Sequence, residues 1–228
     1  MMLKKWELLP ENMQNDAVRP YYELLQKKRV SLFFKRCFDL FVSLILLVLL
    51  SPVFLILAIA IKTDSPGKVF YRQERVTQYG RRFYIHKFRT MVSDADKKGS
   101  LVTVGADSRI TRVGSFIRKC RLDEIAQLLD VISGDMTLVG VRPEVPRYVE
   151  KYTDEMMATL LLPAGVTNLA SICYKDEAEL LDGVEDVERA YLEKVLPGKM
   201  RYNLEGLEKF GFWNDIGLMF RTVIAVLK

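Results

Sequence analysis

The sequence has few of the residues on which disulfide, zinc and triad chemistry usually depends. Its 228 residues include three cysteines, Cys37, Cys120 and Cys173, and one histidine, His86. An odd number of scattered cysteines predicts neither a disulfide framework nor a zinc site, so we expect a reducing, cytoplasmic compartment. A single histidine argues against a histidine-centred metal site or triad, and His86 is expected to be a strand residue with a satisfied hydrogen bond.

Several well-known motifs are also missing. The chain contains no G-x-G-x-x-G, no Walker loop, no H-E-x-x-H, no G-x-S-x-G and no N-x-S/T sequon. These absences argue against dinucleotide binding on a Rossmann fold, P-loop hydrolysis, zinc proteolysis and serine-hydrolase chemistry. The sequence also shows no internal repeat.

Charge is missing altogether from positions 40–61, LFVSLILLVLLSPVFLILAIAI, a run of 22 residues. As a helix the run would be about 33 Å long, close to the thickness of a bilayer's hydrocarbon core. It starts far from Met1 and is longer than the apolar core of a typical signal peptide, so we expect it to stay in the mature protein. Ser51 and Pro52 lie at its centre, where proline predicts a kink.

Two membrane topologies are compatible with this run. A kinked helix can cross the bilayer, or it can dip in and return to the same face. Both flanks are basic, with five Lys or Arg in positions 27–36 and six in positions 62–82. Because positive charge marks the cytoplasmic side, neither end looks external, and the charges alone leave both topologies open.

Positive charge is concentrated in the middle of the chain. Positions 62–122 hold 15 Lys or Arg against 5 Asp or Glu, whereas positions 143–228 hold 10 against 15. Basic regions bind nucleic acid, anionic lipid headgroups or phosphate-bearing small molecules. Here the basic region adjoins a membrane segment, which favours lipid and phosphate, and no nucleic-acid partner is expected.

The basic region begins with a predicted hairpin. KVFYRQERV (68–76) and FYIHKFRTM (83–91) have strand composition, and TQYGRR between them is typical of a turn. Alternation places Lys87 and Arg89 on one face, an arrangement that suits a phosphate group. A solvated basic edge strand is the alternative. Positions 93–109 are expected to form a polar loop.

The stretch KCRLDEIAQLLD (119–130) places Asp123 and Glu124 on the first turn of a predicted helix that ends at Gly134. Acidic residues at a helix start can serve only to stabilise the macrodipole. However, successive helical side chains point about 100° apart, so the two carboxylates must face different partners. Beside the basic residues at 118–121, an ionised carboxylate suits a magnesium ligand or a phosphorus nucleophile.

The segments outside this region are less specific. The loop SGDMTLVGVRPE could bring Asp135, Arg142 and Glu144 to the same pocket. Positions 1–34 predict only a short amphipathic helix around Tyr21 to Gln26, and the chain after 143 reads as helix-rich. The last element, 212–227, has apolar residues at helical spacing and could lie on the membrane or pack on the domain.

Three stretches in order carry a family resemblance: KRCFDLFVSLILLVLLSPVFLILAIAIKTDSPGKVFYRQERV, FYIHKFRTM and RITRVGSFIRKCRLDEIAQLLDVISGDMTLVGVRPE. Together they cover Lys35 to Glu144. The chain resembles the bacterial sugar transferase family, the monotopic polyprenyl-phosphate phosphoglycosyl transferases. The resemblance implies transfer of a sugar phosphate from a UDP-sugar to undecaprenyl phosphate, with UMP released, Mg2+ required and a covalent intermediate formed.

The resemblance also implies site residues. Asp123 would attack the β-phosphorus and carry the phosphosugar, and Glu124 would help to bind the metal ion. The expected phosphate-binding residues are Lys87, Arg89, Arg118 and Arg142. In the family the Ser-Pro segment belongs to a re-entrant helix, which keeps the active site at the cytoplasmic face of the inner membrane.

The chain departs from the family pattern at 164–176, AGVTNLASICYKD. Ala164 replaces a proline, Asn168 a glycine and Ser171 a glutamine, while Cys173, Tyr174 and Lys175 replace an N-G-R, and Val141 replaces a proline earlier in the chain. We expect the 164–176 region to contribute to sugar or nucleotide recognition, so the donor sugar is left undetermined.

The expected fold is an α+β, largely helical, membrane-associated (monotopic) unit with a kinked re-entrant membrane helix, a small β-hairpin and amphipathic interfacial helices. It divides into an N-terminal extension (1–34), the membrane helix (35–62) and a catalytic domain (63–228). Membrane lipids are expected partners, a homo-oligomer is left open, and the function would be to initiate a surface glycan pathway. A membrane-tethered assembly factor without activity and a bitopic phosphate hydrolase are the competing hypotheses; the RLDE, KFR and VRPE matches oppose the first and the basic flanks the second.

Overall fold

A computed structural model describes residues 3–93, 95, 107–174, 184 and 186–227. Most of the polar loop expected at 93–109 therefore lies outside the described residues. Helices predominate among the described residues, together with two small two-stranded sheets, which confirms the largely helical α+β part of the predicted fold class. The helices are η1 (Trp6–Leu8), η2 (Glu11–Met13), α1 (Arg19–Lys27), α2 (Arg29–Asp64), η3 (Gln78–Gly80), α3 (Arg112–Lys119), η5 (Leu122–Gln127), α4 (Leu128–Ser133), α5 (Pro146–Val149), η6 (Met156–Leu161), α6 (Leu169–Cys173), α8 (Val187–Ala190), η7 (Tyr191–Val195), α9 (Leu196–Glu208) and α10 (Phe212–Leu227).

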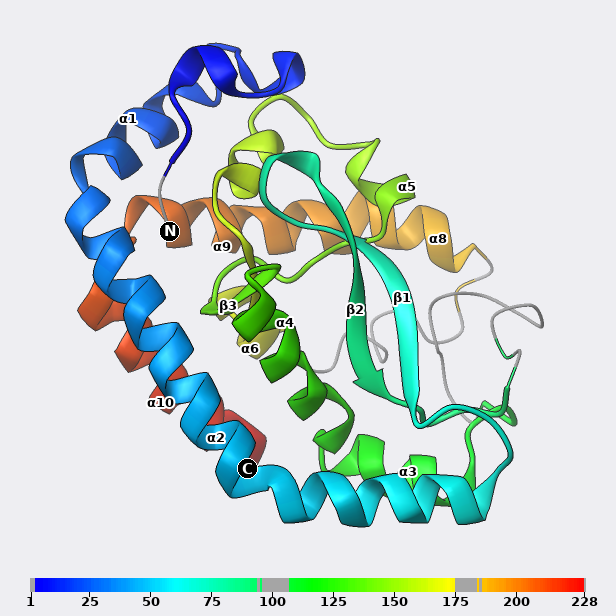
Figure 1. The fold of residues 1–228 in the computed structure, drawn as a ribbon. Coiled ribbons are helices and arrows are strands. Elements are labelled where there is room, and N and C mark those ends of the chain that lie inside the picture. Colours follow the sequence, from blue (N-terminus) through cyan, green and yellow to red (C-terminus); the bar gives the residue numbers. More distant parts are fainter. Residues whose placement is uncertain (1–2, 94, 96–106, 175–183, 185, 228) are drawn as a thin grey trace.

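The apolar run forms the middle of α2, a helix of 36 residues that begins before the run and ends after it. The helix passes without a break through the domain boundary expected between residues 34 and 35. Figure 1 shows that α2 changes direction along its length, and Pro52 lies inside the helix, in its second half, which agrees with the predicted kink. Proline has no amide hydrogen for the carbonyl four residues earlier, and the Ser51 hydroxyl donates to that carbonyl, of Val48, at 2.7 Å.

Most of the apolar surface of α2 is exposed. Only 11% of its most apolar window is buried, and within the described part of the chain it is the helix long and apolar enough to cross a membrane. A core helix of a soluble protein would be mostly buried instead. The exposed large apolar residues of α2 are Val30, Phe33, Phe34, Phe41, Leu44, Ile45, Val48, Leu49, Leu55, Ile56 and Ile59.

The predicted hairpin is confirmed. β1 (Phe70–Val76) pairs antiparallel with β2 (Arg82–Phe88), in a register that joins Phe70 to Phe88 and Val76 to Arg82. The turn between them needs left-handed backbone, which Gly80 adopts with a φ of 74°. In β2, His86 Nδ1 lies 2.6 Å from Asp130 Oδ1, so its hydrogen bond is satisfied as expected.

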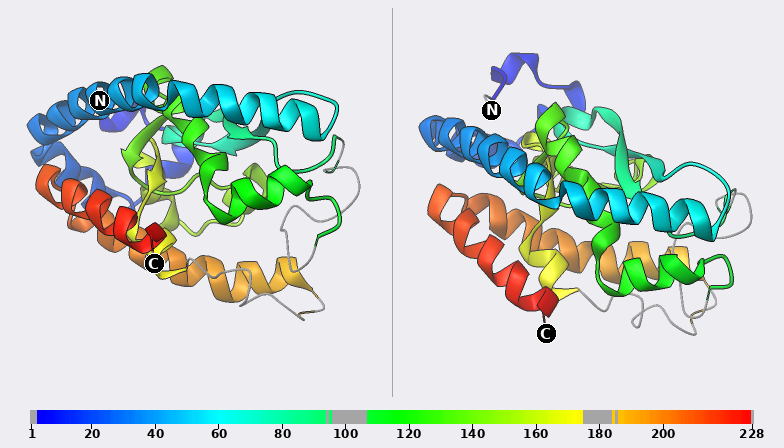
Figure 2. Two further views of the ribbon diagram at one scale, coloured as in Figure 1. Left: turned by 90° about the horizontal axis from the view of Figure 1, so that it is seen from below. Right: turned by 60° about the horizontal axis from the view of Figure 1, so that its bottom comes forward.

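A second, parallel pair, β3 (Met136–Val139) with β4 (Ala164–Thr167), was not predicted. Just beyond β3, Gly140 packs against Gly165. A Cβ added to Gly165 would lie 2.1 Å from the Gly140 carbonyl oxygen. Figures 1 and 2 show α2 and α9 on opposite sides of the molecule, with α4, β3 and the hairpin between them. This layer between the two long helices holds the candidate site.

Residues 3–32 contribute to the hydrophobic core. Leu9, Met13, Leu25 and Leu32 are buried in one cluster with residues of η6 and α9. The short helix predicted there is confirmed as α1, but the docking of the whole segment was missed. Its apolar residues are spaced through two short 3-10 helices and connecting turns, so no single periodic pattern marks them.

Helix α10 packs on the domain, as one of its two interpretations predicted, and its position on a membrane stays a prediction. Asp215 forms an ion pair with the buried Lys35 of α2, at 2.9 Å, so one side of α10 packs on the domain. The same helix exposes Trp213, Phe220 and Ile224, and Trp213 is 79% exposed. An exposed apolar face of this kind is typical of a helix that lies on a membrane.

Candidate active site

The carboxylate pair lies at the start of a helix, as predicted, although its first turns are 3-10 rather than α. Helix α3 ends at Lys119, Arg121 adopts left-handed backbone with a φ of 52°, and η5 begins at Leu122. A 3-10 helix has about 3 residues per turn, so successive side chains diverge by about 120°. Asp123 and Glu124 therefore face different surroundings, as the α-helical argument also required.

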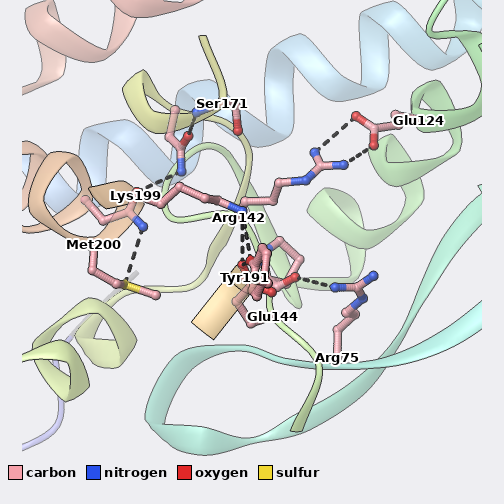
Figure 3. A network of polar contacts seen from close by, with 11 residues as sticks. Arg75, Glu124, Arg142, Glu144, Ser171, Tyr191, Lys199 and Met200 are labelled. Atoms are coloured by element: carbon pink, nitrogen blue, oxygen red, sulfur yellow. Dashed lines mark hydrogen bonds and ion pairs between the residues drawn. The ribbon is translucent and has the colours of Figure 1, made fainter. Parts of the chain in front are cut away.

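Glu124 is held by two cations. Arg142 donates from both terminal nitrogens, to Oε1 and, at 3.2 Å, to Oε2 (Figure 3). Lys87 Nζ lies 3.3 Å from Oε1. Burial alone would raise the pKa of Glu124, but the charges and hydrogen bonds of Arg142 and Lys87 outweigh it and lower the pKa far below its usual value. Arg142 and Lys87 therefore stabilise the ionised form of Glu124.

Asp123 experiences the opposite effect. Burial and the neighbouring charge of Glu124 raise its pKa, against the opposing charges of Lys87 and Arg118. Two adjacent carboxylates with pKa values moved in opposite directions are typical of groups with separate chemical roles. Glu124 forms ion pairs with Arg142 and Lys87, and Asp123 lies close to cations.

Asp123 lines a pocket of about 660 Å³ between the hairpin, α3 and η5. Among the described residues that line it, Asp123 is the only acid, and the basic ones are Lys68, Arg72, Arg75, Lys87, Arg89, Arg109 and Arg118. Such an excess of guanidinium and ammonium groups around one carboxylate suits a ligand with several phosphate charges.

Arg118 lies beside the hairpin and close to Asp123. Its Nε donates to Thr90 Oγ1 at 2.8 Å, which fixes the guanidinium beside the hairpin. Burial lowers the pKa of Arg118, and the charge of Asp123 acts against that change. Together with Lys87, Arg118 therefore places positive charge next to Asp123 from both α3 and β2.

Arg89 has a different environment from the one expected for a phosphate ligand. It is 7% exposed, and its guanidinium donates to the carbonyl oxygens of Pro66 at 2.6 Å, Ser65 at 2.7 Å and Ile61 at 3.4 Å, and to Ser93 Oγ at 3.0 Å. These contacts satisfy backbone carbonyls at and beyond the end of α2, a structural function that leaves few donors for a ligand. Phosphate binding by Arg89 remains an untested prediction.

Replacing Arg89 by methionine is expected to destabilise the protein by about 2 kcal/mol, because several hydrogen bonds from a charged donor are lost. Thermal unfolding of Arg89→Met and of the exposed control Arg82→Met, followed by circular dichroism in nanodiscs, measures this effect. An Arg89→Met midpoint equal to that of the control would contradict the structural function.

Sequence reasoning missed Arg75 as a lining residue of the pocket. Its Nη1 donates to the Pro143 carbonyl at 3.1 Å, and burial lowers the pKa of the guanidinium. The pairing of the two strands could have indicated that Arg75 lines the pocket. Tyr71 pairs with Lys87, and Gln73 and Arg75 lie on the same face of β1 as Tyr71 because side chains alternate along a strand.

The charged residues of the segment SGDMTLVGVRPE, which includes β3, have different partners. Arg142 reaches Glu124 as expected, but Asp135 pairs with Arg81 at 2.6 Å and Glu144 accepts a hydrogen bond from Tyr191 at 2.6 Å. Residues 164–174 form β4 and α6 and do not line the pocket. Their contribution to recognition remains a prediction, and Lys175 lies outside the described residues.

Magnesium fits the donor set of this site only in combination with a ligand. No group of three or more His, Cys, Asp or Glu side chains that could hold a metal occurs in the described part of the chain. Mg2+ is commonly bound by one or two carboxylates plus substrate phosphates. Glu124 can supply one carboxylate, because an ionised carboxylate has about four lone-pair sites and Arg142 and Lys87 occupy only some of those of Glu124.

Comparison with known proteins gives a consistent result. Residues 30–228 match a family model described as bacterial sugar transferase. The chain is 32% identical over 198 residues to the UDP-N-acetylgalactosamine-undecaprenyl-phosphate N-acetylgalactosaminephosphotransferase of Aeromonas hydrophila, covering 86% of this chain and 44% of the relative. It is 32% identical over 218 residues to the UDP-glucose:undecaprenyl-phosphate glucose-1-phosphate transferase of Escherichia coli, covering 93% and 44%.

A shorter relative gives a higher identity. The putative undecaprenyl-phosphate N-acetylgalactosaminyl 1-phosphate transferase of Bacillus subtilis is 39% identical over 135 residues, covering 59% of this chain and 75% of the relative. The present chain thus spans less than half the length of the Aeromonas and Escherichia proteins, and it matches most of the shorter one.

Proposed function

The chain belongs to the bacterial sugar transferase family, and from this premise we propose that it transfers a sugar 1-phosphate from a UDP-sugar to undecaprenyl phosphate, releasing UMP. The observation that carries the proposal is the position of Asp123 as the only acid among the described residues lining a strongly cationic pocket. The named activities of the relatives supply the chemical class of donor and acceptor.

In the first step a carboxylate oxygen of Asp123 attacks the β-phosphorus of the UDP-sugar. The new bond joins this oxygen to phosphorus, the bond from the β-phosphorus to the oxygen bridging the two phosphates breaks, and UMP leaves with that oxygen. The product is an aspartyl phosphosugar, an acyl phosphate. Lys87 and Arg118, which surround Asp123 from β2 and α3, would neutralise the charge on the transferring phosphoryl group.

In the second step an oxygen of undecaprenyl phosphate attacks the same phosphorus. The bond from phosphorus to Asp123 breaks, the carboxylate is restored, and undecaprenyl-diphosphate-sugar forms. Two steps on one carboxylate allow a soluble donor and a lipid acceptor to use one pocket in turn. Bound Mg2+, held by Glu124 and substrate phosphates, would supply further charge neutralisation.

Glu124 and Arg142 would form the fixed side of the site. The ion pairs of Glu124 keep this carboxylate ionised and oriented, so it can support phosphate and metal binding without competing as a nucleophile. These separate roles, with Asp123 as nucleophile and Glu124 supporting phosphate and metal binding, agree with the opposite pKa shifts of the two acids.

We further propose that α2 dips into the cytoplasmic face of the inner membrane and returns. Both arms of the helix contact the same body: in the first, Arg36 Nη1 donates to the Val131 carbonyl at 2.8 Å, and in the second, Leu57 and Ile61 pack with Phe88. A helix whose two ends share one water-facing domain supports a re-entrant arrangement better than a span. Synthesis of a capsule, exopolysaccharide or O-antigen would begin at this face.

Cysteine labelling tests the topology. In a variant without the native cysteines, Val30→Cys and Thr63→Cys place single thiols at exposed positions near the two ends of α2. Both are expected to resist a membrane-impermeant maleimide in intact cells and to react after lysis. Labelling of either thiol in intact cells would contradict the re-entrant arrangement.

The function itself is tested by UMP release. Purified protein in nanodiscs with undecaprenyl phosphate and Mg2+ is mixed in turn with UDP-N-acetylgalactosamine, UDP-glucose and UDP-galactose, and UMP is measured. We expect one donor to be strongly preferred and release to require the lipid phosphate for multiple turnovers. Absence of UMP with every UDP-sugar would favour the inactive assembly factor, and release of inorganic phosphate would favour the hydrolase.

A further inference from the structure

Residues 140–145 join β3 to α5 without regular secondary structure, although they carry Arg142, the main partner of Glu124. Connecting segments are usually more mobile than the elements they join. A guanidinium that must hold a carboxylate in fixed geometry therefore needs a segment that is anchored by other means.

The backbone of this segment, the 140–145 loop, is anchored from two sides. One side is the parallel strand β4 and the other is the hairpin strand β1. The contacts are Gly140 N to the Thr167 carbonyl at 3.0 Å, Gly165 N to the Val141 carbonyl at 2.7 Å, Val76 N to the Glu144 carbonyl at 3.0 Å, and Arg75 Nη1 to the Pro143 carbonyl at 3.1 Å.

The side chain of Glu144 provides a third anchor that is buried and charged. Figure 3 shows Arg142 extending toward Glu124, while Glu144, two residues later, extends into a separate cluster. Glu144 Oε1 accepts hydrogen bonds from the Tyr191 hydroxyl at 2.6 Å and from Lys199 Nζ at 3.3 Å, and Lys199 also donates to Tyr191 at 3.0 Å. Glu144 is 7% and Lys199 6% exposed.

The surroundings of this cluster are apolar, with Val145, Tyr148, Val195, Leu196 and Met200 buried around it. A buried ion pair in such surroundings contributes little net stability, because the cost of removing two charges from water offsets their attraction. In other proteins, replacing a buried ion pair by apolar residues of similar volume is often neutral or stabilising. The pair is therefore better explained by the position that it imposes on the loop than by stability.

We propose that Glu144, with Lys199 as its buried counter-ion and Tyr191 as hydrogen-bond donor, is a positioning residue that sets Arg142 on Glu124. The expected effect on kcat rests on the proposed function, whereas the expected effect on the position of the 140–145 loop does not. Tyr191 and Lys199 lie in η7 and α9, about 50 residues further along the chain, so the C-terminal helices hold one wall of the site without lining it.

The test replaces the whole cluster by apolar residues of similar size, in Glu144→Leu/Tyr191→Phe/Lys199→Met. The triple replacement removes the Glu144–Lys199 ion pair and the hydrogen bonds of Tyr191 to both residues in one step, so neither charge of the pair is left alone, and the unfolding midpoint is expected to stay within a few degrees of wild type or to rise. The kcat for UMP release is expected to fall about tenfold, with the KM for the UDP-sugar little changed, because the loop loses its fixed position. A wild-type kcat would overturn the proposal.

The matched control is Arg189→Gln/Glu193→Gln. It removes an exposed ion pair, at 2.8 Å, between Arg189 of α8 and Glu193 of η7, and it should leave kcat unchanged. A second arm repeats the cluster replacement in an Arg142→Gln background. If Glu144 acts through Arg142, the cluster replacement should cause no further loss of kcat there, whereas an additive loss would overturn the proposal.

Amide hydrogen exchange gives an activity-independent result. Faster exchange across residues 141–145 in the cluster variant, but not in the control, is expected, and unchanged exchange would overturn the proposal even if no UDP-sugar is turned over by wild type. Should the cluster variant fail to fold, Glu144→Asp keeps both charges and shortens the anchor by one methylene. It should also lower kcat and speed exchange in the 140–145 loop, and wild-type values of both would overturn the proposal.

Discussion

Asp123→Asn is expected to lower UMP release at least about 1,000-fold, because it removes the nucleophile while keeping the shape of the side chain. The amide oxygen of the substituted side chain could still accept hydrogen bonds from neighbouring cations, so the pocket should keep its affinity for the UDP-sugar. The measurement is steady-state UMP formation with the donor that wild type prefers. Asp123→Ala serves as a second variant, because asparagine can deamidate back to aspartate.

The covalent intermediate can be observed directly. Wild-type protein incubated with UDP-[14C]sugar in the absence of undecaprenyl phosphate should become labelled, and hydroxylamine should release the label, because it cleaves acyl phosphates. Asp123→Asn should remain unlabelled. The control is Asp135→Asn, which removes a carboxylate of the following loop that pairs with Arg81 and should label like wild type. Full turnover by Asp123→Asn would indicate direct transfer between donor and acceptor.

Glu124→Gln is expected to lower kcat about 100-fold and to raise the Mg2+ concentration needed for half-maximal activity. Two effects combine. The neutral amide is a weaker ligand for magnesium, and it leaves Arg142 and Lys87 without the charge that orients them. The measurement is a magnesium titration of UMP release at saturating donor.

The matched control is Glu74→Gln, which removes a surface partner of Arg82 on the hairpin, at 3.5 Å, and should behave as wild type. If Glu124→Gln lowers kcat without changing the magnesium dependence, Glu124 serves only to orient Arg142 and Lys87. An unchanged kcat would contradict any role for Glu124 in the reaction.

Much of the site could be predicted because its signals are local or motif-bound. The pair Asp123 and Glu124 was placed at a helix start from apolar spacing alone, and the structure confirms the start and changes only the type of helix. Lys87, Arg118 and Arg142 came from family-matched positions, and all three lie at or beside the pair. Each of these positions depends on a short segment with a strong periodic or motif pattern.

The exceptions share a physical cause. Strand alternation put Arg89 on the same face as Lys87, but alternation cannot show that the end of α2 passes close enough for its carbonyls to take that guanidinium. Glu144 was expected to return charge to the pocket, yet the buried Lys199 and Tyr191 hold it elsewhere. In both cases the competing partner lies more than 20 residues away in the chain.

The sequence by itself determined the long apolar helix, its kink, the hairpin and the start of the carboxylate helix, because hydropathy, proline's missing amide and side-chain periodicity act over a few residues. Only the tertiary structure decided which cations face Asp123, where Arg75 and Glu144 point, and how residues 3–32 dock. These outcomes depend on the relative stability of alternative long-range contacts. A charged side chain binds whichever partner the folded chain brings within reach, and that partner is not encoded in its neighbours.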